Sequence, residues 1–135
     1  MTPADIALPR VKAAEGYRPD PYTDTLGNLT TGYGCLLRGW SEPFASAVCS
    51  LQIANAEADC DGQSWYVNAD KVRQSVLVEL VFNMGVAKLQ TFTHMIAALN
   101  AQDWSTAADE LQNSVWFHQV GTRGPKLVTL LRNGG

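Results

Sequence analysis

Residues 15–34, EGYRPDPYTDTLGNLTTGYG, decide how the first part of the chain folds, because their composition differs from that of the neighbouring segments. Proline, glycine, asparagine, threonine and tyrosine are typical of turns and short strands, and Gly27-Asn28 marks the reversal of a hairpin. A three-residue loop from Leu26 to Asn28, with Asn28 in the left-handed region, would set Asp24 opposite Thr30. A two-residue loop would shift that pairing by one, so the sequence leaves both registers open.

A helix is expected before this stretch. Thr2 is a suitable N-cap, Pro3 suits the first helical position, and Gly16 is a C-terminal stop. Pro9 removes a helix hydrogen bond, which predicts either a kink or a helix that restarts at about Leu8. The first helix is therefore expected to end at Glu15.

Helical patterns dominate the rest of the chain. Ser41 is the expected cap of a helix over 41–60, and Asn68 is the expected cap of a helix that stops at Gly85. The centre of the second helix, VLVELVF at 76–82, is apolar nearly all round, so we expect it to be the buried axis of a helical lobe. Further helices are expected over residues 91–102, 103–114, 114–119 and 122–131. A helix, a small β-hairpin and about six more helices make a predominantly helical α+β protein.

Composition limits the classes of function. A chain of 135 residues fits one domain, and 46% hydrophobic with 17% charged residues is a globular profile. The net charge of −3 and the pI near 5.2 argue against nucleic acid as a partner. The apolar runs are far shorter than the ~20 residues of a spanning helix, and the N-terminus lacks the pattern of a signal peptide. We therefore expect no membrane insertion, and synthesis in a cytoplasm without a signal peptide.

The cysteines and histidines suggest no metal centre. Cys35, Cys49 and Cys60 are odd in number and form no CxxC pair, so they do not fit a structural zinc site, and free thiols are expected. A nucleophilic pair of Cys35 with His94 or His118 is an alternative that spacing leaves open. No metal or cofactor is implied.

Two acidic residues carry the chemical hypothesis. A carboxylate at a helix C-terminus feels the negative end of the helix dipole, so the position of Glu15 favours its protonated form and a general-acid role. Asp24, on an open hairpin rich in hydroxyls, should remain ionised. Cleavage of a glycosidic bond needs two such carboxyl groups, one to protonate the leaving oxygen and one to handle water or the sugar cation.

The spacing of these residues resembles that of a known family. Glu15, eight residues, Asp24, five residues, Thr30 and then GYG are similar to the catalytic signature of bacteriophage lysozymes related to the T-even phage enzyme, glycoside hydrolase family 24. The resemblance continues in VFNMG at 81–85 and in the segments 91–111 and 114–134, in order and spacing. Agreement at several places in register makes chance similarity unlikely.

The resemblance implies a muramidase that hydrolyses the β-1,4 bond between N-acetylmuramic acid and N-acetylglucosamine in bacterial peptidoglycan, with inversion. By position, Glu15 would be the general acid, Asp24 would orient or activate water, and Thr30 would hold that water. Arg123 matches the arginine that pairs with the catalytic glutamate, and Asn83 lies where the family has an amide near the sugar-binding cleft. Three aromatic residues are candidates for sugar subsites: Tyr33, Trp40 and Trp65.

The implied fold is lysozyme-like, with an N-terminal helix and hairpin lobe (1–65) packed against a helical lobe (66–135) and the cleft between them. The whole would be a single catalytic domain, and we expect a monomer. It would act on peptidoglycan in the periplasm after release through a separate pore, or be carried in a phage particle. A lytic transglycosylase and a non-catalytic peptidoglycan-binding module are the alternatives.

Two features depart from the family pattern. Cys35 stands where the family usually has a histidine that makes a structural ion pair, which puts that pair in doubt but not the two acids. The chain is also acidic, whereas these lysozymes are often basic, so its attraction to an anionic wall should be weaker and less sensitive to salt.

Overall fold

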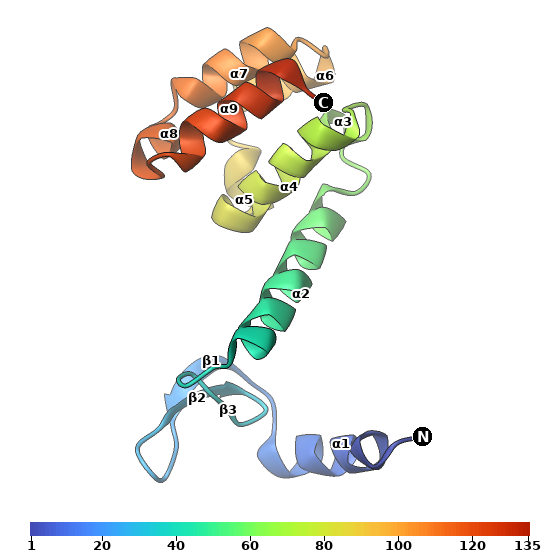
Figure 1. Cartoon of the computed structure of the whole chain (residues 1–135), viewed down its shortest axis with the longest axis vertical. Helices are drawn as coiled ribbons and strands as arrows, with labels where there is room; N and C mark the ends of the chain where they lie inside the picture. Colours follow the sequence, from blue (N-terminus) through green and yellow to red (C-terminus); the bar gives the residue numbers. More distant parts are fainter. The chain divides into compact units, whose positions relative to one another are not determined.

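The computed structural model describes residues 1–135, which form two compact units, residues 1–46 and 47–135 (Figure 1). Helices contain 64% of the residues, and the strands form one three-stranded antiparallel sheet. The predicted α+β class with predominant helix is therefore confirmed. That the two units together make a single catalytic domain stays a prediction.

The first unit begins with helix α1, Pro3–Glu15, as the local signals predict. The Thr2 side chain accepts a hydrogen bond from the backbone of Asp5, whose carboxylate accepts one from the backbone N–H of Thr2, so the capping box is complete. Gly16 ends the helix with a φ of 71°. The helix runs through Pro9 without interruption, so the alternative of a restart at Leu8 is wrong.

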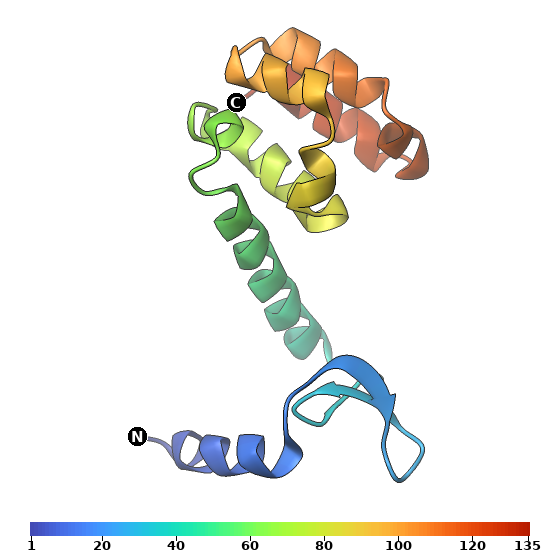
Figure 2. The same cartoon turned by 180° about the vertical axis from the view of Figure 1, so that it is seen from behind.

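Helix α1 leads into the sheet (Figure 2), whose strands are β1 Arg18–Thr23, β2 Leu29–Gly32 and β3 Cys35–Leu36, in that order. The sequence predicted the first two strands as a hairpin and missed the third. Strand β3 is only two residues long, and GYG before it supplies the reversal: Gly32 and Gly34 both have positive φ. A strand this short leaves no period-two pattern to detect.

The hairpin register differs from both predicted registers. Tyr22 lies opposite Thr30 and Thr23 lies opposite Leu29, so Asp24 does not face Thr30. The loop does have three residues, but they are residues 25–27, and Gly27 rather than Asn28 takes the positive φ, at 84°. Glycine adopts this conformation without the steric penalty of a side chain, which explains the choice. Asp24 and Thr30 still share one face of the hairpin, because the shift is by two residues.

Helix α2, Glu42–Cys60, runs across the boundary between the two units and begins after Ser41, whose Oγ accepts a hydrogen bond from the N–H of Phe44. Seven helices follow it: α3 Ser64–Val67, α4 Lys71–Met84, α5 Val86–Leu89, α6 Thr93–Asn100, α7 Trp104–Gln112, α8 Val115–Gln119 and α9 Arg123–Asn133. Eight helices after the hairpin exceed the predicted six, because α3 and α5 are single turns.

The cap of α4 was assigned wrongly. Its N-cap is Asp70, whose carboxylate accepts from the N–H groups of Val72 and Arg73, whereas Asn68 ends α3. Asp70 also pairs with the Arg73 guanidinium at 2.8 Å. Arg73 in turn donates to the carbonyls of Leu131 and Arg132 at the end of α9. The contact of Arg73 with the distant end of α9 therefore favours Asp70 as the N-cap of α4.

The core of the helical unit surrounds α4, as the sequence predicts. Val76, Leu77 and Leu80 have no exposed surface, and Figures 1 and 2 show α7 and α9 side by side above this helix. Trp65 belongs to this core at 4% exposure, so it does not line a sugar subsite. None of the helices combines the length and the hydropathy that crossing a bilayer requires.

Candidate active site

Glu15 is the last residue of α1, and its carboxyl group lies against the hairpin at Gly34. A Cβ built on Gly34 would be 2.5 Å from Oε2 of Glu15 and 2.8 Å from its Cδ. The prediction that the hairpin folds back beside the end of the first helix is therefore confirmed. The Glu15 side chain is exposed, so it is open to a ligand from the other side.

Asp24 holds the hairpin loop through one carboxylate oxygen. Its Oδ1 accepts hydrogen bonds from the backbone N–H groups of Leu26 at 2.9 Å and Asn28 at 2.8 Å. Its Oδ2 has only a long contact of 3.5 Å with the Asn28 amide. The backbone N–H of Asn28 is the main cause that holds the pKa of Asp24 below its usual value, which agrees with the ionised state expected for this residue.

The two oxygens of Asp24 thus have different surroundings. Oδ1 is engaged by the loop, as in any turn-forming aspartate, while Oδ2 is available to accept a hydrogen bond from water or substrate. A structural and a chemical role are compatible in this one side chain.

Thr30 is the one polar residue in the buried set, at 3% exposure. Its Oγ1 lies 3.3 Å from the carbonyl oxygens of both Tyr22 and Asn28. Both contacts are long, and a hydroxyl can donate only one hydrogen while keeping two acceptor sites. The side chain therefore retains acceptor capacity next to the hairpin loop that Asp24 holds.

Tyr33 stands between the two glycines of GYG and is 41% exposed. Its ring lies 5.6 Å from that of Tyr17, and the Lys12 ammonium lies 5.0 Å from its centroid. An aromatic surface is thus held beside the end of α1. Lys12, one helical turn before Glu15, adds a cation to this aromatic surface.

Arg123 and Asn83, the two predicted site residues of the helical unit, each have a partner there. Arg123 Nε donates to Oε1 of Glu79 at 2.8 Å, and both side chains are a little over one third exposed, at 38% and 37%. Asn83 accepts a hydrogen bond on Oδ1 from the indole Nε1 of Trp116 at 2.7 Å. Sequence reasoning found neither partner, because both come from distant segments. Pairing of Arg123 with Glu15 stays a prediction.

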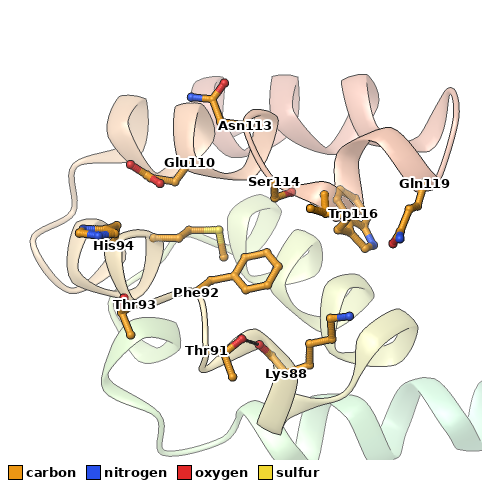
Figure 3. A pocket seen from close by; sticks show the side chains of 12 residues that line it. Lys88, Thr91, Phe92, Thr93, His94, Glu110, Asn113, Ser114, Trp116 and Gln119 are labelled. Atoms are coloured by element: carbon orange, nitrogen blue, oxygen red, sulfur yellow. Dashed lines mark hydrogen bonds between the residues drawn. The ribbon is translucent and has the colours of Figure 1, made fainter.

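A pocket of about 530 Å³ adjoins Trp116 in the helical unit. In Figure 3, Glu110 and His94 lie at one end of this pocket, Trp116 and Gln119 lie at the other, and Phe92 lies between them. Lys88 is a further polar residue of its lining. The pocket therefore offers aromatic surface together with groups that can hydrogen-bond.

The thiols are free, as expected, and no three His, Cys, Asp or Glu side chains form a group that could hold a metal ion. The Sγ of Cys35 points to the carbonyl of Leu36 at 3.7 Å. Burial is the main cause that raises the pKa of Cys60 to about 11, and the neighbouring carboxylate of Asp59 adds to it. This thiol is therefore not a nucleophile near neutral pH.

A glutamate at a helix end beside a hairpin that carries an aspartate has the two kinds of side chain that an acid/base glycoside hydrolase uses. Comparison with known sequences gives the family. The Phage lysozyme family model matches residues 12–132, and the chain belongs to this family of T4-type lysozymes, which are peptidoglycan hydrolases.

Three curated proteins illustrate the relationship. The chain is 32% identical to "Probable T4-type lysozyme 1" and 26% identical to "Probable T4-type lysozyme 2", both of Dictyostelium discoideum, with 92% of each chain covered in both cases. It is 29% identical to the "Pre-baseplate central spike protein Gp5" of Enterobacteria phage T4, over 67% of this chain and 16% of that protein.

Proposed function

We propose that this lysozyme cleaves the β-1,4 bond between N-acetylmuramic acid and N-acetylglucosamine and inverts the anomeric carbon. The single observation that carries the proposal is the placement of the Glu15 carboxyl against the hairpin whose loop Asp24 holds in ionised form. Inversion requires a water molecule between the two carboxyl groups, and hence a separation of roughly 6.5–9.5 Å.

In the proposed mechanism Glu15 protonates the glycosidic oxygen as the bond breaks. Asp24 accepts a hydrogen bond from the attacking water on Oδ2, the oxygen that the loop leaves available. Thr30 has spare acceptor capacity and holds the same water. The proton passes from Glu15 to the leaving group, and water loses one to the aspartate side, so charge is conserved over the turnover.

Three further residues would bind the substrate or orient the acid: Arg123, Asn83 and Tyr33. Only Nε of Arg123 is used by Glu79, and its terminal nitrogens have no partner within the helical unit, so they can donate to a further carboxylate; the resemblance to the family implies that this is Glu15. The amide nitrogen of Asn83 is likewise without a partner there, and it can donate to a sugar oxygen. The exposed ring of Tyr33 offers a stacking surface for a sugar.

The proposed partner is the peptidoglycan strand, with the protein acting as a monomer and without nucleic acid. Two routes to the wall remain as proposals, release into the periplasm through a separate pore and transport in a phage particle. The second is supported by similarity to a relative whose name places it in the central spike of a phage.

Digestion of purified peptidoglycan by the wild type and by Glu15→Gln tests the proposal. Loss of the general acid should lower turnover by on the order of 10²-fold to 10⁴-fold while the melting temperature stays near that of the wild type. Products should carry reducing ends in the inverted, α configuration. Anhydro ends would indicate a lytic transglycosylase, and binding without product would indicate a non-catalytic module. Full activity of Glu15→Gln would remove this residue from the mechanism.

A further inference from the structure

Gly34 has two properties that together set it apart from the other glycines of the hairpin. Its φ is +72°, which favours glycine for backbone reasons alone. In addition, the space that a Cβ would occupy is filled by the carboxyl group of Glu15, with Oε2 at 2.5 Å, Cδ at 2.8 Å and Cγ at 3.3 Å. A side chain at position 34 would therefore meet three successive side-chain atoms of the proposed acid.

Gly32 provides a matched comparison within the same reversal. Its φ is +65°, close to that of Gly34, yet a Cβ there would have no atom within 4 Å. A substitution at either glycine strains the backbone in the same way, and only the one at Gly34 also meets the Glu15 carboxyl.

We propose that Gly34 is a positioning residue: the missing side chain at this point lets the Glu15 carboxyl lie against the hairpin, and this contact sets where the acid presents its proton. The inference rests on the proposed role of Glu15. It concerns where the Glu15 carboxyl lies, whereas the proposed function concerns what this carboxyl does chemically.

The displacement that a methyl group would cause can be worked out from these contacts. Ordinary contacts of a Cβ begin at 3.4 Å, so Oε2 would have to move from 2.5 to 3.4 Å, or about 0.9 Å. The atoms met belong to the far end of a flexible side chain, which can rotate away at little loss of stability. A misplacement of ~1 Å in a catalytic group can lower the rate by about 10²-fold. The main effect should therefore appear in turnover.

The experiment compares Gly34→Ala with Gly32→Ala in kinetics on soluble peptidoglycan fragments and in thermal melting. Both variants should melt lower than the wild type by similar amounts, because both carry alanine in a left-handed conformation. Only Gly34→Ala should lose kcat, by about 10-fold to 10²-fold, with KM near the wild-type value. Equal kcat in the two variants would overturn the proposal.

A second measurement, thermal melting, detects the contact between residue 34 and the Glu15 carboxyl without an activity assay. Glu15→Ala removes the carboxyl, so any part of the melting-temperature loss of Gly34→Ala that exceeds the loss of Gly32→Ala should vanish when both glycine variants are made in Glu15→Ala. If Gly34→Ala fails to fold while Gly32→Ala folds, the double variant Glu15→Ala/Gly34→Ala should fold, and a double variant that also fails would contradict the inference. The ¹³C chemical shift of the Glu15 carboxyl should change in Gly34→Ala and stay unchanged in Gly32→Ala.

Failure of the two proposals can be told apart. Full activity of Glu15→Gln would overturn the function of the acid, while the shift and melting data would still test the contact. An inactive Glu15→Gln together with equal kcat for the two alanine variants would overturn the positioning role alone.

Discussion

Asn83 offers a sharp test, because the two ends of its amide have different tasks. The indole N–H of Trp116 is only a donor, so it fixes the amide with Oδ1 toward the indole and leaves Nδ2 free. Asn83→Asp keeps the acceptor and removes the donor. Asn83→Leu removes both ends. The two variants therefore separate a loss of stability from a loss of substrate binding.

The expected loss of stability follows from the burial of Trp116, which is 4% exposed. An unsatisfied buried donor costs roughly 1–3 kcal/mol. The adjoining pocket is large enough to admit water to the indole, so the lower end, about 1 kcal/mol, is expected for Asn83→Leu. With an unfolding entropy of ~2.1 cal/mol/K per residue, that free energy corresponds to a melting temperature lower by about 3–4 °C. Asn83→Asp should melt near the wild type.

Asn83→Asp should keep its stability but bind the substrate more weakly. Loss of one hydrogen bond to the substrate, about 1 kcal/mol, should raise KM roughly fivefold and leave kcat nearly unchanged. Steady-state kinetics and chemical denaturation, with Trp116→Phe as the partner of a double-mutant cycle, measure both effects. A wild-type KM for Asn83→Asp would refute substrate contact by Nδ2. A stability of Asn83→Leu equal to the wild type would refute the value assigned to the indole hydrogen bond.

Two further predictions concern Asp24 and the thiols. Asp24→Asn should lose activity but keep the loop acceptor and hence most of the melting temperature, whereas Asp24→Ala should lose both the activity and the loop acceptor. The pKa of Asp24 is held below its unfolded value of 3.8, so its contribution to stability is complete above that pH and is lost as the pH falls through the folded pKa. The melting temperature of the wild type should therefore fall more steeply in acid than that of Asp24→Asn. Iodoacetamide at neutral pH should modify the exposed Cys49 in the native protein. It should reach the buried Cys60, whose pKa is about 11, only after unfolding. Mass spectrometry of the labelled peptides measures the order, and labelling of Cys60 before Cys49 would contradict the prediction.

Local chemistry explains why several elements could be predicted from the sequence. The capping box of Thr2 with Asp5 and the stop at Gly16 lie within one or two helical turns of the residues that they control. Five of the seven residues at 76–82 are buried because this part of the helix is apolar nearly all round. The presence of Glu15 at a helix end, and of Asp24 on a hairpin, follows from such signals.

Other features depend on partners far along the chain. Asp70 rather than Asn68 caps α4, since Asp70 also binds Arg73, which in turn holds the end of α9. Both alternatives satisfy the local rules equally well, and only the complete set of contacts separates them.

By itself, the sequence determined most of the elements and the membership of the lysozyme family, and it supplied the hypothesis of the acid pair, because capping, periodicity and spacing are properties of short segments. Tertiary structure alone decided that the carboxyl of Glu15 lies on Gly34, that Trp116 orients Asn83 and that Glu79 holds Arg123. These contacts join residues separated by 19, 33 and 44 positions. Their geometry is set by the packing of whole elements, which no local pattern encodes.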